Sequence, residues 1–227
     1  MSYLNSVLLV EGKDDQYAIA ELMEHYIDWP GEKISAPVKI EEMNGVEQLL
    51  NTETISIRLK SSPIRNIGVV IDADDVFQSR WDSLRNLFKA GFPDIPTVLP
   101  PTGLICQNTE GKRLGIWIMP NNSSSGMLET FLGAFVSEQG TDNPLWLHAN
   151  NSCVIAKEHG ANYRSVHFDK AKIHSWLAWQ DPPGDSFGTA LIKKVLNPSA
   201  PSAQIFAQWF MELYQLPAKK VLLLDLS

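Results

Sequence analysis

Short runs of consecutive apolar residues alternate with helical patterns along the first part of the chain. Residues 7–10 and 67–71 are almost entirely Val, Leu and Ile, as expected of parallel strands that are buried on both faces. Apolar residues at helical spacing predict a helix over residues 15–28, and residues 38–43 have the pattern of a second strand. Helical spacing returns after this strand and again over residues 81–88. The alternation predicts parallel strand–helix–strand units with right-handed crossovers.

The pattern changes in the next part of the chain. Apolar residues 104–106 and 114–119 flank a polar stretch at 108–112, which predicts a hairpin and an antiparallel edge of the sheet. Downstream of residue 140 the spacing is mostly helical, and clusters of Pro and Gly separate the segments. The helices predicted in this part cover residues 145–159, 170–179, 186–196 and 202–216. The apolar tail at 219–227 is expected to dock as an edge strand or to bind a partner.

These elements define the expected fold. Residues 1–138 are predicted to form an α/β domain of Rossmann-like type, with a central, mainly parallel sheet flanked by helices. Residues 139–227 are predicted to form a helical C-terminal elaboration. No segment repeats at a fixed period, so a repeat architecture is not indicated. A chain of 227 residues is long enough to bury a substantial core in this arrangement.

Composition indicates a globular protein of the cytoplasm. Apolar residues make up 44% of the chain and charged residues 20%. No stretch reaches the roughly eighteen consecutive apolar residues of a membrane span, so none is expected. Residues 1–5 lack the basic start of a secretory signal. The two cysteines, Cys106 and Cys153, have no metal-ligand spacing and are expected to be reduced thiols.

Net charge limits the kind of nucleic-acid contact to be expected. A formal charge of −7 argues against a protein that coats nucleic acid, because such binding depends on Lys and Arg neutralising phosphates. The charge does not exclude a nuclease, since divalent ions would neutralise part of an acidic site. Seven basic residues fall mainly in the C-terminal half, which we expect to hold any bound DNA or RNA. They are Lys112, Arg113, Arg164, Lys170, Lys172, Lys193 and Lys194.

Acidic residues follow directly after two of the predicted strands. Glu11 closes the first apolar run, shortly before Asp15, and Asp72 and Asp74 close a later run. The carboxyl ends of parallel strands meet at one edge of a sheet, so these carboxylates can lie close together although about sixty positions separate them. Alternation along a continuing strand would also place Asp72 and Asp74 on the same side. Because clustered carboxylates repel unless a cation shares them, the pattern predicts a Mg²⁺ or Mn²⁺ site for phosphate chemistry.

These acidic strand ends resemble a known family. The sequence Val-Glu-Gly-x-x-Asp around Glu11, followed by Asp72-Ala73-Asp74 after a later strand, resembles the Toprim domain of topoisomerases, bacterial primases, ribosomal-RNA maturases and OLD-family nucleases. The resemblance covers roughly residues 5–135, and the remaining layout is similar to small stand-alone Toprim-related bacterial proteins. Topoisomerases and primases usually have a small residue and Gly after Asp-x-Asp, where this chain has Asp75-Val76-Phe77. The chain is therefore more similar to the OLD-like and stand-alone branches.

The resemblance implies a role for each acidic residue. Glu11 would ligate a metal ion or act as general base, and Asp72 and Asp74 would hold the metal that polarises a phosphate. Similarity to OLD-like nucleases adds Asp15, the residue that ends the Glu-Gly-x-x-Asp pattern. It also adds Glu129, which belongs to a Leu-Glu element after a polar loop and would be a further metal ligand.

OLD-like nucleases also place a lysine beside the metals to stabilise the anionic transition state. Lys170 and Lys172 are the candidates, and because they point in different directions on a helix, at most one is expected to serve. The candidate residues have structural explanations as well. Asp15 can cap a helix, Glu129 can interact with a helix dipole, and the two lysines can belong to a solvated helix start.

The function predicted from this pattern is a metal-dependent phosphodiesterase that acts on nucleic acid. A role in phage defence with an ATPase partner is implied by the resemblance alone. The chain has no Gly-x-x-x-x-Gly-Lys-Ser/Thr loop and is not itself expected to be a P-loop ATPase. Haloacid-dehalogenase phosphatases carry Asp-x-Asp in their first strand rather than their third, and the Glu-Gly start is unlike a response-regulator receiver. The competing hypothesis is a non-catalytic Toprim-fold module that binds metal and nucleotide, or a protein partner.

Overall fold

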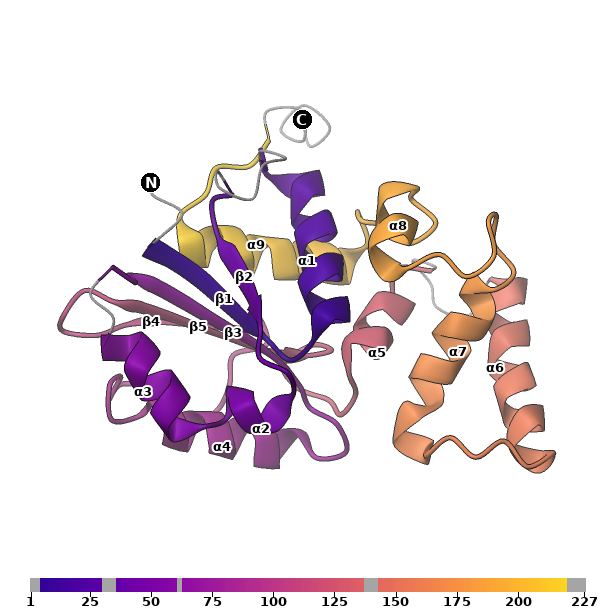
Figure 1. Cartoon of the computed structure of the whole chain (residues 1–227), viewed down its shortest axis with the longest axis horizontal. Coiled ribbons are helices and arrows are strands. Elements are labelled where there is room, and N and C mark those ends of the chain that lie inside the picture. Colours follow the sequence, from indigo (N-terminus) through magenta and orange to yellow (C-terminus); the bar gives the residue numbers. More distant parts are fainter. Residues whose placement is uncertain (1–4, 30–35, 61–62, 137–142, 220–227) are drawn as a thin grey trace.

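Five strands form a single sheet within the described part of the chain, which comprises residues 5–29, 36–60, 63–136 and 143–219 of this computed structural model. The strands are β1 (Ser6–Val10), β2 (Lys39–Glu42), β3 (Asn66–Asp72), β4 (Leu104–Gln107) and β5 (Arg113–Met119). They lie in the order β2-β1-β3-β5-β4 (Figure 1). β1 pairs in parallel with β2 and β3, and β3 pairs in parallel with β5. β4 pairs antiparallel with β5 and forms one edge of the sheet.

Helices fill the connections between strands and most of the C-terminal part. They are α1 (Lys13–Tyr26), α2 (Val46–Leu49), α3 (Thr52–Lys60), α4 (Phe77–Phe88), α5 (Leu128–Gly133), α6 (Pro144–Glu158), α7 (Phe168–Leu177), α8 (Phe187–Ile192) and α9 (Pro201–Tyr214). α1 and α9 lie on one face of the sheet, and α2, α3 and α4 lie on the other (Figure 1). α6 and α7 pack against each other beyond the end of the sheet, next to α5 (Figure 1).

β1 is buried on both faces, as its continuous apolar run predicts. Leu8 and Val10 belong to the core on the α1 and α9 side of the sheet. Val7 and Leu9 point to the opposite core, which contains Trp81 of α4. The sheet is therefore the central layer of a three-layer structure with a hydrophobic core on each face.

α9 lies directly on the sheet because two glycines leave room for it. Gly68 of β3 and Gly115 of β5 are register partners. A Cβ atom at Gly68 would lie 2.3 Å from the Tyr214 hydroxyl oxygen, and one at Gly115 would lie 2.4 Å from a Leu213 methyl group. The Tyr214 hydroxyl donates a hydrogen bond to the Val7 carbonyl at 2.8 Å. The last helix of the described chain thus completes the core around the first strand.

The main predictions about the fold are confirmed. The sheet is mainly parallel, β4 and β5 form the predicted antiparallel edge, and the part of the chain after residue 143 is largely helical. Within the described ranges, no helix is long and apolar enough to cross a membrane. The domain boundary predicted near residue 138 and most of the apolar tail lie outside the described residues. The helical C-terminal part is not separate from the sheet, because α9 packs on it.

Replacing Gly68 by alanine should destabilise the protein, because the new methyl group would overlap Tyr214 and Leu8. We expect the free energy of unfolding to fall by about 2 kcal/mol, as is typical of overpacked cores. Gly91→Ala is the matched control, since a Cβ atom there meets no atom closer than 3.7 Å. Urea denaturation followed by circular dichroism measures both variants, and equal stabilities would contradict a packing role for Gly68.

Candidate metal centre

The carboxyl ends of three neighbouring parallel strands each present an acidic residue. Glu42 and Asp72 are the last residues of β2 and β3, and Glu11 directly follows β1. The chain leaves β1 through α1 on one face of the sheet and leaves β3 through α4 on the other (Figure 1). Such a reversal opens a crevice at the carboxyl edge of an α/β sheet, where ligands bind. Glu11 spans this crevice, and its Oε1 accepts a hydrogen bond from the Asp72 backbone N–H at 2.8 Å.

A pocket of about 720 Å³ opens at this edge of the sheet. Its acidic lining residues are Glu11, Asp14, Asp15, Glu42, Asp72, Asp74 and Glu129. Lys13, His167 and Lys170 also line it. The five acidic residues proposed from the sequence as metal ligands are thus brought together from three distant parts of the chain.

Asp72 ties the end of β3 to the start of α5. Its Oδ1 accepts a hydrogen bond at 2.9 Å from the backbone N–H of Leu128, one of the N–H groups without a partner inside the helix. The next residue, Glu129, is only 4% exposed, and its Oε1 lies 2.8 Å from the Nζ atom of Lys170. The Leu-Glu element therefore supplies one hydrogen-bond donor to Asp72 and one buried carboxylate to the pocket.

Asp74 reaches the pocket by a different route from the one predicted. β3 ends at Asp72, and Asp74 has a left-handed backbone with φ of 53°. The prediction that strand alternation places the two carboxylates on one side assumed that the strand continues through Asp74, and this is wrong. Both carboxylates nevertheless line the pocket. Arg80 of α4 holds this turn. Its Nη2 donates to Asp74 Oδ2 at 2.6 Å and its Nε donates to the Asp72 carbonyl at 2.8 Å.

Asp15 combines the two roles that the sequence allowed. Its Oδ2 accepts a hydrogen bond from the Gly12 backbone N–H at 3.1 Å, which is a capping contact at the start of α1. Its side chain is also buried and lines the pocket. Burial, reinforced by the negative charge of Glu11, raises the pKa of Asp15 to about 7. The capping role does not remove this residue from the acidic cluster.

Burial raises the pKa of two further carboxyls in the pocket. For Asp72 the burial effect is reinforced by the charges of Asp15 and Glu11, and the pKa lies well above its ordinary range. Burial also raises the pKa of Glu11, against the opposing effects of the Asp72 N–H and the Arg80 guanidinium. The pocket therefore favours protons or another source of positive charge.

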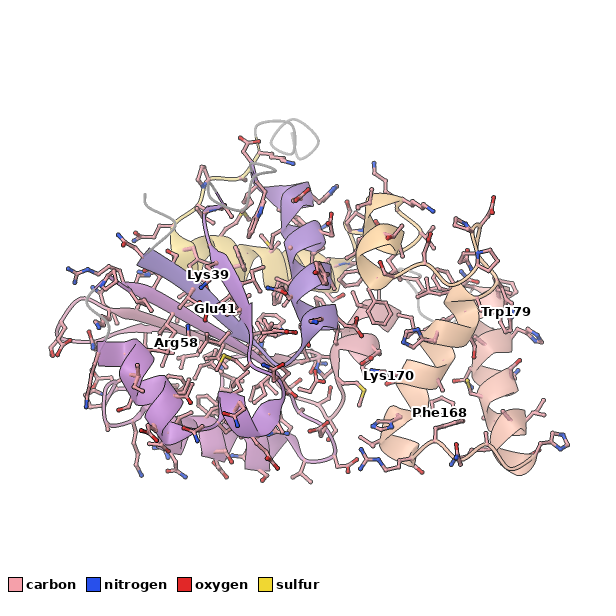
Figure 2. All side chains as sticks on the ribbon, in the orientation of Figure 1. Lys39, Glu41, Arg58, Phe168, Lys170 and Trp179 are labelled. Carbon is pink, nitrogen blue, oxygen red and sulfur yellow. The ribbon has the colours of Figure 1, made fainter. Side chains whose placement is uncertain are left out.

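α7 places one of the two candidate lysines at the pocket. Lys170 lies on the side of α7 that faces α5 (Figure 2), where it pairs with Glu129. Although partial burial opposes it, this ion pair and other nearby carboxylates raise the pKa of Lys170. Lys172 lies elsewhere, with its Nζ 4.1 Å from the centre of the Trp146 ring. Two helix positions correspond to a rotation of about 200°, so the Lys172 side chain lies on another side of α7 from Lys170. Lys172 is therefore not a residue of the candidate site.

The donor atoms suit a hard divalent cation by their chemistry. Carboxylate oxygens are the ligands that Mg²⁺ prefers, and burial together with the neighbouring carboxylate charges raises the pKa values of Asp15 and Asp72, which a bound cation would lower. In the described parts of the chain, no group of three or more His, Cys, Asp or Glu side chains is gathered closely enough to enclose an ion. Hydrogen bonds hold one oxygen each of Glu11, Asp72 and Asp74 toward other partners. The side chains would have to approach one another to share a cation.

Among the residues not proposed from the sequence, Glu42 and His167 line the pocket, and Arg80 contacts Asp72 and Asp74 from beside it. Arg80 lies six positions after Asp74, and a basic residue at the start of the helix after an acidic turn was a usable signal. Glu42 ends a strand that the pattern did predict, so the parallel topology placed it at this edge. His167 carried no local signal, because its position depends on how α7 docks against α5.

The fold and the pocket define the class of this protein: an α/β protein with an acidic pocket at the carboxyl edge of its sheet. Comparison with known proteins assigns the family. The chain belongs to the family described as protein of unknown function (DUF3226), whose model matches residues 5–215. The matched region contains every strand from β1 to β5, the helices through α9, and all of the pocket residues. Searches of curated proteins and of solved structures find no match.

The raised pKa of Asp15 should make stability depend on pH. The folded protein keeps this proton up to about pH 7, whereas the unfolded chain loses it near pH 4. Between these values the folded state binds more protons, so the free energy of unfolding falls as pH rises. Raising the pH from about 5.5 to about 8 should lower the stability of metal-free protein by about 2 kcal/mol.

Urea titrations at both pH values test this pH dependence in the wild type and in Asp15→Asn. The amide cannot ionise, so the variant should lose the part of the dependence that Asp15 contributes, together with the part that arises because the Asp15 charge raises the pKa of Asp72. A pH dependence that survives the substitution in full would show that another group causes it.

Replacing Arg80 by lysine should loosen the turn that carries Asp74. A lysine lacks the planar fork that serves both the Asp72 carbonyl and the Asp74 carboxylate. We expect a loss of about 1–2 kcal/mol in the free energy of unfolding. Arg85→Lys on the same helix is the control, because the buried Arg85 Nε has no hydrogen-bond partner among the described residues. Thermal unfolding measures both, and similar losses would argue against a specific role for Arg80.

Proposed function

We propose that this protein is a Mg²⁺- or Mn²⁺-dependent phosphodiesterase that acts on nucleic acid. The observation that carries the proposal is the convergence of Glu11, Asp15, Asp72, Asp74 and Glu129 on one pocket at the carboxyl edge of the sheet. The resemblance of the two acidic strand ends to Toprim domains supports the same function. Their positions in space agree with what that resemblance implies for a shared site.

The residues of the pocket would divide the work. Glu11, Asp72 and Asp74 would hold the cation, which supplies Lewis acidity toward a phosphate when bound. The Glu11 oxygen that is not bonded to the Asp72 N–H could accept a proton from the attacking water, a role helped by its raised pKa. Lys170, held by Glu129, would place positive charge beside the phosphate as its negative charge grows.

A second candidate function is a non-catalytic module that binds metal and nucleotide, or a protein partner such as an ATPase. The spacing of the carboxylates favours the form that binds a protein partner, because the described residues contain no closely gathered metal-ligand group. The net charge of −7 also opposes general affinity for nucleic acid. An ATPase partner, phage defence and a cytoplasmic location follow from the resemblance and composition, and they belong to either candidate function.

Cleavage of nucleic acid tests the proposed enzyme. Plasmid, single-stranded DNA and structured RNA are incubated with Mg²⁺ or Mn²⁺, and the wild type should cut at least one of them. Asp72→Asn and Glu11→Gln should each slow cutting by about 100-fold or more, because an amide is a neutral and poorer ligand of nearly the same shape. Asp82→Asn, at an exposed position of α4, is the matched control and should cut like the wild type.

Two further measurements separate the candidate functions. Lys170→Ala should slow cutting by about 100-fold while Lys172→Ala should not, since only Lys170 lines the pocket. Isothermal titration with Mn²⁺ measures binding independently of cutting. Binding that Asp72→Asn weakens, without any cleavage by the wild type, supports the module instead of the enzyme. Absence of both binding and cleavage would reject the enzyme and the metal-binding form of the module, and would leave only a module for a protein partner.

A further inference from the structure

One part of this acidic protein that borders the pocket carries a net positive charge: the α6–α7 hairpin, defined here as residues 144–179. Four lysines or arginines against two acids give this segment a formal charge of +2. The whole chain carries −7, so the remainder of the chain carries −9. Four of the five histidines also lie in the hairpin. The hairpin extends beyond the end of the sheet, on the side where the acidic pocket and α5 lie (Figure 1).

Three nitrogen-bearing side chains of the hairpin form a row that leads into the pocket. Arg164, His167 and Lys170 are spaced three residues apart. Arg164 has an extended backbone and caps the short 3-10 helix Ser165–His167, which leads into α7, and Lys170 lies in the first turn of α7. Arg164 Nη2 lies 3.0 Å from His167 Nε2, and both His167 and Lys170 line the pocket. A guanidinium only donates hydrogen bonds, so His167 Nε2 is the acceptor and its proton lies on Nδ1. These three residues are called the basic row below.

Contacts between α5 and α7 hold the basic row beside the carboxylates. The Nζ atom of Lys170 lies 2.8 Å from Glu129 Oε1. At the adjacent positions, the Thr130 hydroxyl donates to Asp169 Oδ2 at 2.7 Å. Two successive residues of α7 thus bind two successive residues of α5, and α5 in turn donates a hydrogen bond to Asp72. One end of the row is at the pocket, and the other is at the turn between α6 and α7.

We infer that the basic row binds the phosphates of a nucleic-acid strand next to the phosphate held at the acidic pocket. The inference rests on the proposed function and names the surface that holds its substrate. Seven carboxylates line the pocket, so a polyanion that approaches it needs cations alongside. From Arg164 to Lys170 the chain makes one extended step of about 3.3 Å and five helical steps of about 1.5–2.0 Å, which together extend for roughly 11–13 Å. That length corresponds to about three to four phosphates of one strand.

The other lysines of the hairpin are engaged within it. Lys172 Nζ lies over the Trp146 ring, and Lys157 Nζ donates to the carbonyls of Ala161 and Tyr163. Lys172→Ala therefore removes one positive charge from the hairpin, as Arg164→Ala does, but leaves the basic row intact. It is the matched control for a test of the row.

Binding is measured by fluorescence anisotropy with a labelled single-stranded oligodeoxynucleotide of about twenty residues and with its duplex. Ca²⁺, which prefers the same oxygen ligands, replaces Mg²⁺ to limit cutting. Arg164→Ala should weaken binding by about 3- to 10-fold and reduce the slope of log affinity against log salt by about 0.7–0.9, the effect of one lost phosphate contact. Arg164→Ala combined with His167→Ala should weaken binding further. Lys172→Ala should stay within about twofold of the wild type and keep its salt slope.

The outcomes separate this inference from the proposed function. Equal losses for Arg164→Ala and Lys172→Ala would overturn the basic row, because only the total charge would then matter, while Mn²⁺-dependent cutting by the wild type would still support the enzyme. A wild type that binds neither oligonucleotide yet cuts a substrate also overturns the row alone. A wild type that neither binds nor cuts nucleic acid overturns both. Circular dichroism of each variant ensures that folded proteins are compared.

Discussion

The hydrogen bond from the Asp72 backbone N–H to the Glu11 carboxylate sets the arrangement of the whole site. It joins the ends of β1 and β3, so the parallel pairing of these strands fixes where Glu11 lies. Asp72 also fixes the start of α5 relative to β3, because its own carboxylate accepts a hydrogen bond from the N–H of Leu128. Glu129 then pairs with Lys170 of α7. A single series of contacts thus runs from the centre of the sheet to the helical hairpin.

This arrangement gathers carboxylates where their charges oppose folding. Asp15 and Glu129 are buried and Asp72 is half-buried, and burial raises the pKa of Asp15 and of Asp72. Groups held in such an unfavourable state are a mark of sites selected for function rather than for stability. Stability comes from elsewhere, above all from the aromatic side chains under α9. There the Trp117 and Phe206 rings meet edge to face, with their centroids 5.1 Å apart.

How much of the site the sequence could predict depended on the range of the interactions that place each residue. Glu11 and Asp72 were predictable, because parallel strands must end at the same edge and the acids follow those strands directly. Asp74 was misplaced, since the end of β3 and the left-handed turn depend on contacts with Gly126 and Arg80. The choice between the two lysines required the docking of α7, which periodicity cannot supply.

The same limit applied to the fold. The apolar runs predicted the strands, and their alternation with helical segments predicted a parallel sheet, because both signals are local. The position of α9 depends on contacts between residues far apart in the chain. Gly68 and Gly115 inside strands were a sign that something approaches closely. Their partners, Leu213 and Tyr214, lie about a hundred or more positions away, and no local pattern connects them.

The late position of α9 bears on how the protein matures during synthesis. All five strands of the described residues have been made by Met119, yet the face of the sheet that contains Leu8 and Val10 receives α9 only after residues 201–214 have been added. At about 5–20 residues per second, the roughly 95 residues from Met119 to Tyr214 take on the order of 5–19 s to translate. During that interval a nascent chain on the ribosome carries an incompletely covered apolar sheet. Chaperones bind exposed apolar surfaces of this kind. The time needed to synthesise α9 therefore sets how long they can bind the newly made sheet.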